Sequence, residues 1–260
     1  MNIHPFFHRS TGTLTYLITR GSHAAVIDPV LDFQDGVVTS TSLQQIIDEI
    51  ESQGVTLDYI LETHIHADHL TGSKRLQQHC GGKTVISKRI VEVYDNWRDK
   101  LQNEPLAAFD LLVEDGDELP FGDHVISVLA TPGHTPTDLT FALGENIFVG
   151  DTLFAPARGT ARVDFPGGSA STLYHSIKRL FSLPDNTNVY LCHDYPQDSD
   201  EPVISTTLAT QKADNVMLND KVSEQEYSST RLTRDATLAA PKLLPWAIPY
   251  NLTYHLPNIH

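Results

Sequence analysis

Apolar positions recur along this chain with two different periods, which predict an alternation of strands and helices. Ser42 precedes an apolar stripe that recurs every three to four residues, and Gly54 follows it, so the segment between them is predicted to be an amphipathic helix. Shorter apolar runs bounded by turns such as Arg20-Gly21-Ser22 predict strands. In the first part of the chain we predict strands at 13–19, 24–28, 57–62 and 84–87, and a second helix at about 69–79.

The pattern changes after about residue 110, where turns rather than helices separate short strands. These strands are predicted at 111–113, 125–131, 139–142 and 147–149. A helix at 173–181 and a strand at 189–192 follow, so the layers are expected in the order helix, sheet, sheet, helix. The pattern from 202 to about 219 is helical, and the tail is interrupted by Pro241, Pro245, Pro249 and Pro257. We expect one α/β domain over residues 1–260, with about 202–260 as a helical and Pro-rich extension packed on it.

Composition and charge restrict the partners of this protein. The formal net charge is −15, with 33 acidic against 18 basic residues, which argues against binding to nucleic acid or to an anionic membrane surface. The sequence has no apolar run long enough for a spanning helix and no signal-peptide pattern, so we expect a soluble, cytoplasmic protein. Its two cysteines, Cys80 and Cys192, are predicted to be reduced thiols, with buried packing as their default role.

The residues that carry chemistry stand where predicted strands end. After the strand at 57–62 the chain reads His64-Ile65-His66-Ala67-Asp68-His69, and three further candidates end later strands: His134, Asp151 and His193. Imidazole and carboxylate ligands suit zinc, iron or manganese, and the near absence of thiolates argues against a structural Cys-type zinc site. This pattern predicts an open, catalytic metal site, and its simplest alternative is a His-rich polar loop.

This set of residues resembles the metallo-β-lactamase superfamily over about residues 10–200. The resemblance implies an α/β fold, a four-layer αββα sandwich with the metal at one edge of the two sheets. In dinuclear members of the superfamily, one metal would be held by His64, His66 and His134. A second metal would be held by Asp68, His69 and His193, and Asp151 would bridge the two.

Within the superfamily, the stretches 63–72, 159–165, 172–176 and 192–195 resemble the glyoxalase II-like persulfide dioxygenases, and 234–238 resembles their bacterial branch. That resemblance implies oxidation of glutathione persulfide by O₂ to sulfite and glutathione. It also implies one Fe(II) per chain, held by His64, His134 and Asp151. Two imidazoles and one carboxylate leave positions open for substrate and O₂. The remaining candidates, His66, Asp68, His69 and His193, would surround these ligands, and Asp68 or His69 could orient a ligand imidazole by hydrogen bonding.

An anionic substrate requires local positive charge in a protein this acidic. Arg158 and Arg162 follow Asp151 closely and are the candidate substrate-binding residues, although an ion pair between Arg162 and Asp164 is an equal alternative. Tyr195 is the remaining candidate, because its hydroxyl could donate to substrate or bound oxygen. An ordinary half-buried tyrosine is the alternative there.

Two other functions stay open. The first is a dinuclear hydrolase of the glyoxalase II type, acting on a glutathione thioester with two Zn(II) or a mixed Fe/Zn pair. Its ligands would be the same residues, so the sequence does not exclude it. The second is a non-catalytic, metal-dependent sensor or binding module. We expect no rhodanese-like domain in this chain, and the apolar residues of the tail predict packing on the domain or a homodimer.

Overall fold

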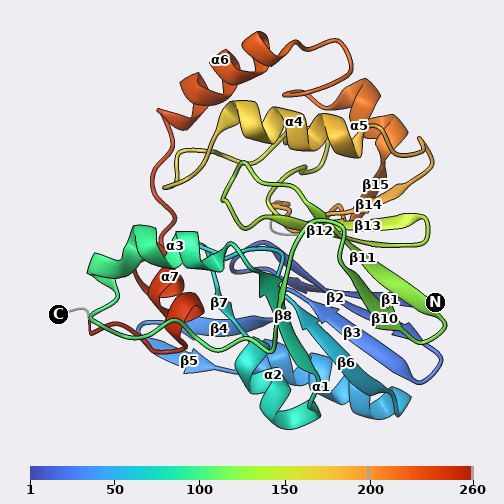
Figure 1. Ribbon diagram of the computed structural model, residues 1–260, viewed down its shortest axis with the longest axis vertical. Helices are drawn as coiled ribbons and strands as arrows, with labels where there is room; N and C mark the ends of the chain where they lie inside the picture. Colours follow the sequence, from blue (N-terminus) through green and yellow to red (C-terminus); the bar gives the residue numbers. More distant parts are fainter. Residues whose placement is uncertain (198–199, 259–260) are drawn as a thin grey trace.

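Two six-stranded sheets form the centre of the molecule, seen in a computed structural model that describes residues 1–197 and 200–258 (Figure 1). The first sheet consists, in spatial order, of β1 (Asn2–His8), β2 (Thr13–Arg20), β3 (His23–Ile27), β6 (Thr56–Leu61), β8 (Lys83–Ser87) and β9 (Leu111–Val113). The second consists of β10 (Glu118–Phe121), β11 (His124–Ala130), β12 (Leu139–Leu143), β13 (Asn146–Val149), β14 (Asn188–Tyr190) and β15 (Ser205–Thr207). A small third sheet joins β5 (Val37–Thr39), β4 (Val30–Gln34) and β7 (Leu70–Thr71).

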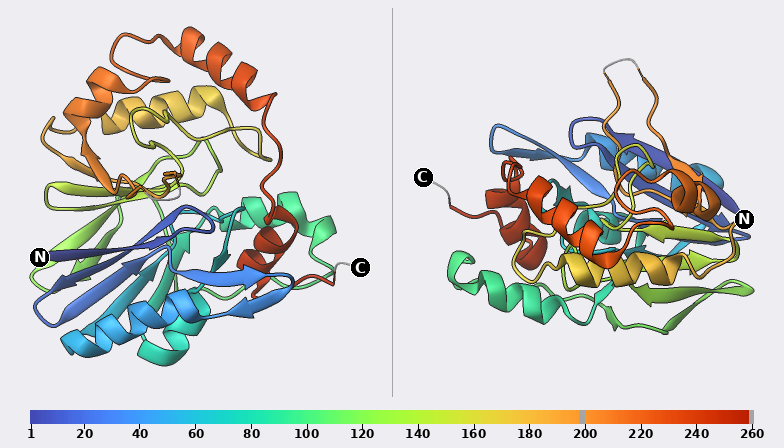
Figure 2. Two further views of the ribbon diagram at one scale, coloured as in Figure 1. Left: turned by 180° about the vertical axis from the view of Figure 1, so that it is seen from behind. Right: turned by 90° about the horizontal axis from the view of Figure 1, so that it is seen from above.

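Helices cover the outer faces of both sheets, as the two views in Figure 2 show. The first sheet is covered by α1 (Thr41–Gln53) and α2 (Ser73–Cys80). The second is covered by α4 (Ala170–Leu180) and α5 (Leu208–Asp214), and α6 (Glu224–Asp235) packs on α4 farther from the sheet. At one end of the sandwich lie α3 (Ile90–Trp97), a 3₁₀ turn (Arg98–Lys100) and α7 (Leu244–Thr253). The four-layer αββα sandwich expected from the sequence is therefore confirmed.

The hydrophobic core lies in two layers that match the predicted apolar faces. Between the sheets, aromatic side chains such as Tyr16, Phe121 and Phe141 are buried in one cluster. On the other side of the first sheet, the stripe of α1 packs against Leu17 and Ile60. Full burial of a Leu or Ile side chain contributes about 1.5–3 kcal/mol. The stripe alone therefore fixes which face of α1 contacts the sheet.

Several predicted element boundaries were wrong. The strand β1 was missed, and it tolerates Pro5 because it is an edge strand paired only with β2. The second helix begins at Ser73 rather than at about 69, because Leu70 and Thr71 pair with β4. The helix predicted from residue 202 is short, since Ser205–Thr207 pairs with β14 as β15 before α5 begins.

The tail also differs from the prediction. The polar stretch after 219 contains α6, which begins at a capping box of Ser223 and Glu226. The proline-interrupted segment contains α7, because Pro245 lies in the first helical turn, where no amide donor is needed. The apolar residues of this segment pack on their own domain, which is the first of the two alternatives expected for them: Leu243, Leu244, Trp246 and Ile248. In residues 1–197 and 200–258, no helix combines the length and apolarity of a membrane span.

Candidate metal centre

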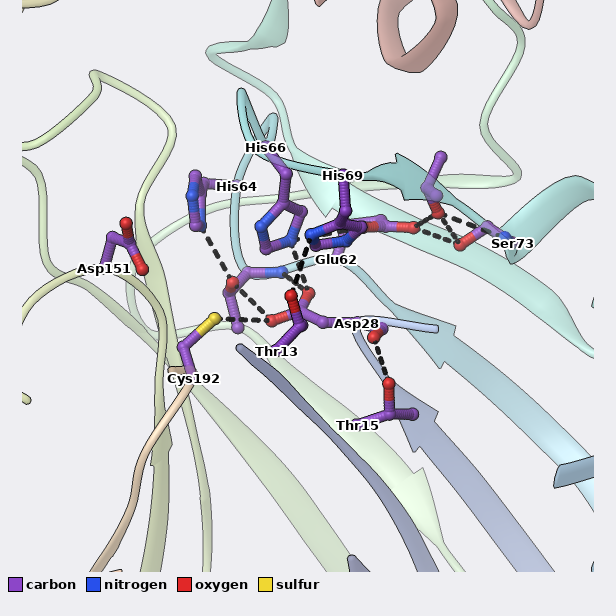
Figure 3. Close-up of polar contacts among 12 residues, drawn as sticks. Thr13, Thr15, Asp28, Glu62, His64, His66, His69, Ser73, Asp151 and Cys192 are labelled. Atoms are coloured by element: carbon purple, nitrogen blue, oxygen red, sulfur yellow. Dashed lines mark hydrogen bonds and ion pairs between the residues drawn. The ribbon is translucent and has the colours of Figure 1, made fainter. Parts of the chain in front are cut away.

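All seven candidate ligands converge at one edge of the sandwich, between the two sheets. The segment of residues 62–69, here called the histidine loop, follows β6 and carries four of them. The others follow β11, β13 and β14 of the second sheet. Figure 3 shows His64, His66 and His69 side by side, with Asp151 facing them from the second sheet. The structure therefore brings together the strand ends at which the sequence places the candidate ligands.

Four groups of side chains among the described residues could each hold a metal ion, and two of these groups consist of candidate ligands alone. In the first, one ligand atom from each of His64, His134 and Asp151 lies within 4.8 Å of the others. In the second, the same holds for His66, Asp68 and His69. Asp151 lies between two imidazoles, with Oδ2 at 3.6 Å from His134 Nε2 and Oδ1 at 3.3 Å from His193 Nε2. One carboxylate can thus serve a single metal or bridge two.

The donor atoms of this edge fit a metal because many of them are buried without another partner. Among the described residues, nine buried side-chain nitrogen or oxygen atoms have no hydrogen-bond partner, and six of these belong to the candidate ligands. They are both ring nitrogens of His66, His69 Nε2, His193 Nε2, Asp68 Oδ2 and Asp151 Oδ1. Buried polar atoms in folded proteins are otherwise nearly always paired, so this concentration points to a cation.

Hydrogen bonds behind the ligands determine which ring nitrogen faces the site. His134 Nδ1 donates to the Arg162 carbonyl at 2.7 Å, which leaves Nε2 for the metal. His64 Nδ1 lies 3.0 Å from the hydroxyl of Thr63, whose own proton is donated to Asp28 Oδ2 at 2.7 Å. Asp28 also accepts from the Thr63 amide at 2.8 Å. Asp28 therefore anchors the start of the histidine loop.

Close backbone approach at Gly150 is required for this geometry. A Cβ atom at Gly150 would lie 2.9 Å from the Thr63 side chain and 3.2 Å from His64 Nδ1. Any larger residue would push the end of β13 away from the histidine loop. Because Asp151 follows directly, such a shift would separate it from His64.

The electrostatic surroundings keep the ligands in forms that bind metals. Burial, followed by repulsion from neighbouring imidazoles, lowers the pKa of His64 and His66 well below the ordinary value, so both rings are neutral at pH 7. Burial raises the pKa of Asp68, but the imidazoles of His193 and His69 outweigh it and hold that pKa well below its usual range. Neutral imidazole and ionised carboxylate are the states that coordinate divalent metals.

A cleft of about 770 Å³ opens onto these residues, and its floor includes Asp68, His134 and Asp151. All three predicted substrate-binding residues line it: Arg158, Arg162 and Tyr195. Arg162 is already engaged, because it donates to both oxygens of Asp164 at 2.6 and 2.7 Å and to the Ala239 carbonyl at 2.7 Å. This is the ion pair that the sequence left as an alternative.

The other two cleft residues are partly available. Arg158 donates to the Tyr195 carbonyl, and its Nε lies 3.8 Å from Asp194 Oδ1, but half of its side chain is exposed. The Tyr195 ring stacks on that of His193 with 6.0 Å between centroids, and the residue is 52% exposed. Both cysteines are free, as predicted, and Cys192 lies behind the site with Sγ 3.6 Å from Asp28 Oδ2.

Sequence reasoning missed three kinds of residue around the centre. Asp28 ends a predicted strand in the same way as His193, so the strand-end rule could have found it. Arg231 and Asp235 of α6 hold the loop that carries the Arg162 carbonyl, and Asn251 of α7 holds the histidine loop. No local pattern indicates these three, because each contacts backbone groups far away in the sequence.

A four-layer αββα sandwich with histidines and aspartates at one edge defines a metalloprotein of the metallo-β-lactamase type. The family model described as the metallo-beta-lactamase superfamily matches residues 9–193, and the chain belongs to this superfamily. The chain is 38% identical to a beta-lactamase hydrolase-like protein of Xylella fastidiosa over 95% of its own length, but covers only 59% of that protein.

Two further relatives bear on the branch of the superfamily. The chain is 32% identical to the mitochondrial persulfide dioxygenase ETHE1 of Homo sapiens, over 92% of this chain and 83% of that protein. The crystal structure of ETHE1 from Myxococcus xanthus superimposes with a TM-score of 0.78 at 33% identity, covering 96% of this chain and 98% of that one. The similarity to both includes the C-terminal region that follows the matched family model.

Proposed function

We propose that this protein is a persulfide dioxygenase that oxidises glutathione persulfide with O₂ and uses one Fe(II) per chain. The observation that carries the proposal is the group formed by His64, His134 and Asp151, two imidazoles and one carboxylate whose donor atoms lie within 4.8 Å of one another. His134 and Asp151 also line the cleft. Such a set suits an iron that must bind both substrate and O₂. Similarity to persulfide dioxygenases over almost the whole chain supports the same branch.

Bound Fe(II) would supply open coordination positions for the persulfide sulfur and O₂, and the electrons that activate oxygen. Overall, glutathione persulfide, O₂ and water give glutathione, sulfite and two protons. His193 is suited to accept a proton at Nε2, which lies 3.5 Å from Asp68 and 3.3 Å from Asp151. Burial lowers the pKa of His193, but these two carboxylates outweigh that effect and raise it.

The remaining side chains of the cleft bind and orient the substrate in this proposal. Arg158 provides a half-exposed guanidinium for an anionic group. Tyr195 offers a hydroxyl beside His193, and Phe154 and Phe165 form apolar walls that restrict water. Arg162 acts indirectly, because its carbonyl orients His134 while its guanidinium is held by Asp164.

A dinuclear hydrolase of the glyoxalase II type is the second candidate. It is favoured by the second group, His66, Asp68 and His69, whose donor atoms also lie within 4.8 Å of one another. A hydrolase would use the metals to lower the pKa of a bound water and to polarise a thioester carbonyl. The name of the Xylella fastidiosa relative agrees with this class.

Anaerobic purification followed by metal analysis separates the two candidates. We expect one iron per chain and O₂ uptake that requires glutathione persulfide. Two metals per chain, together with thioester cleavage without O₂ uptake, would refute the dioxygenase. Asp68→Ala discriminates further, since a mono-iron enzyme keeps its iron with impaired turnover, whereas a dinuclear enzyme loses its second metal. Asp185→Asn, a surface residue paired with Lys212, is the matched control.

A further inference from the structure

The C-terminal helix α7 contacts the histidine loop through one buried polar side chain. Asn251 is 1% exposed, and its Nδ2 donates to the carbonyls of His66 and His69, each at 2.9 Å. Its Oδ1 accepts from the amide of Thr71 at 2.8 Å. These three hydrogen bonds cover the second half of the histidine loop and the start of β7, about 180 residues away in the sequence.

The amide side chain is matched to this segment of irregular backbone. The residues from Glu62 to His69 lie outside helices and strands, so their buried carbonyls cannot be satisfied by a regular ladder. Asn supplies two donors and one acceptor in a single plane. By fixing the peptide groups that follow His66 and His69, Asn251 also fixes the directions in which these two side chains leave the backbone.

The apolar side of α7 reinforces the same contact. Ile248 and Leu252 are buried in a cluster with Ile65 and Ala67, the two residues that alternate with the candidate ligands. One face of the loop therefore carries the candidate ligands, and the other face packs on α7. Figure 1 shows α7 at the end of the sandwich where the histidine loop passes into β7.

We infer that Asn251 is a positioning residue for the metal centre, and that docking of α7 and metal binding strengthen each other. If α7 favours the arrangement of the loop that binds metal, then metal must favour the docked helix by the same factor, since coupling between two equilibria is reciprocal. The inference rests on the metal centre of the proposed function, because Asn251 holds the loop that carries His64 through the backbone of His66 and His69. It does not depend on persulfide oxidation.

The test uses Co²⁺ added to the metal-free full chain, with affinity measured by chelator competition and geometry by visible absorption. Asn251→Ala should bind Co²⁺ about 10- to 100-fold more weakly, the usual range for residues that support ligands from behind, with an altered spectrum. Asn251→Asp keeps the acceptor and the size but loses both donors, and should show the same change. Thr253→Val is the control on the same helix, because its hydroxyl contacts only Pro249 and His255.

Hydrogen exchange provides the reciprocal measurement. Co²⁺ should slow amide exchange in residues 244–253 of the wild type and of Thr253→Val, and should slow it much less in the two Asn251 variants. The inference alone would be refuted if both Asn251 variants bound Co²⁺ with wild-type affinity and spectrum, or if Co²⁺ did not change amide exchange in α7. Failure of the wild type to bind Co²⁺ would overturn the metal site itself, and the inference with it.

Discussion

A buried ion pair in α6 gives the most quantitative prediction for this fold. Arg231 and Asp235 are 2% and 3% exposed, and the guanidinium donates to Asp235 Oδ1 from Nε at 2.9 Å and to the Thr160 carbonyl from Nη1 at 2.9 Å. Asp235 Oδ2 accepts from the Val163 amide at 2.8 Å. Asp235→Ala would leave the buried Arg231 cation without its counter-ion and the Val163 amide without a partner.

The expected cost of Asp235→Ala follows from these contacts. Breaking a buried pair by removal of one partner costs about 3–5 kcal/mol, and leaving an amide unsatisfied adds about 1 kcal/mol or more. We therefore expect the free energy of unfolding to fall by about 4–6 kcal/mol. In a chain of this size about 2–4 °C is lost per kcal/mol, which lowers the melting temperature by roughly 8–24 °C.

Urea unfolding followed by circular dichroism measures this change, and a double-mutant cycle separates the pair from its surroundings. The cycle consists of Asp235→Ala, Arg231→Met and the variant with both changes. The double variant removes the unpaired charge and should recover most of the lost stability. Asp123→Ala removes the partner of Arg20 in an exposed pair and should not change the midpoint measurably. A cost below about 1 kcal/mol for Asp235→Ala, or a double variant no more stable than the single one, would refute the reasoning.

Two further predictions concern the surroundings of the metal centre. Gly12 has φ +70°, and a Cβ there would lie 2.6 Å from the Asp194 carbonyl and from the Tyr195 ring, so Gly12→Ala should reduce turnover. Gly21→Ala is the control, because Gly21 has φ +58° but nothing within 4 Å of its Cβ. It should change stability slightly and leave turnover unchanged. Burial, followed by repulsion from a nearby carboxylate, raises the pKa of Glu62 to about 8. This group should therefore release a proton when the metal-free protein unfolds between pH 5 and 8, and its contribution to stability should fall as pH rises through that range. In urea titrations, stability should fall less, or rise more, with pH in Glu62→Gln than in the wild type over this range, and an identical pH dependence would contradict the assignment.

The sequence predicted the fold best where one element buries one face. The stripe of α1 ends at Gly54, which adopts the left-handed conformation expected of a helix stop, and the strand that leads into the histidine loop was correctly located. The prediction failed in α7, where Pro249 lies inside the helix. Tertiary packing of α7 against two core clusters outweighs the low helix propensity of proline, and local patterns do not contain that information.

The candidate metal centre was predictable for a related reason. Ligands at strand ends are brought together by the topology of the sheets, so the positions of His134, Asp151 and His193 follow from the fold alone. The residues that support the ligands do not follow from it. Asp28, Asp235 and Asn251 bind backbone atoms of distant loops, and such contacts depend on the detailed course of the chain rather than on any periodic pattern.

The C-terminal segment also changes the electrostatic interpretation of the cleft. Arg162 was expected to supply charge for an anionic substrate, but Asp164 neutralises it. Arg234 and Lys242 line the same cleft, and neither forms an ion pair with another described residue. Because the protein carries a net charge of −15, cations without an acidic partner at the cleft are important for attracting an anionic substrate. The extension that follows β15 thus supports both halves of the metal centre and supplies much of the free positive charge above it.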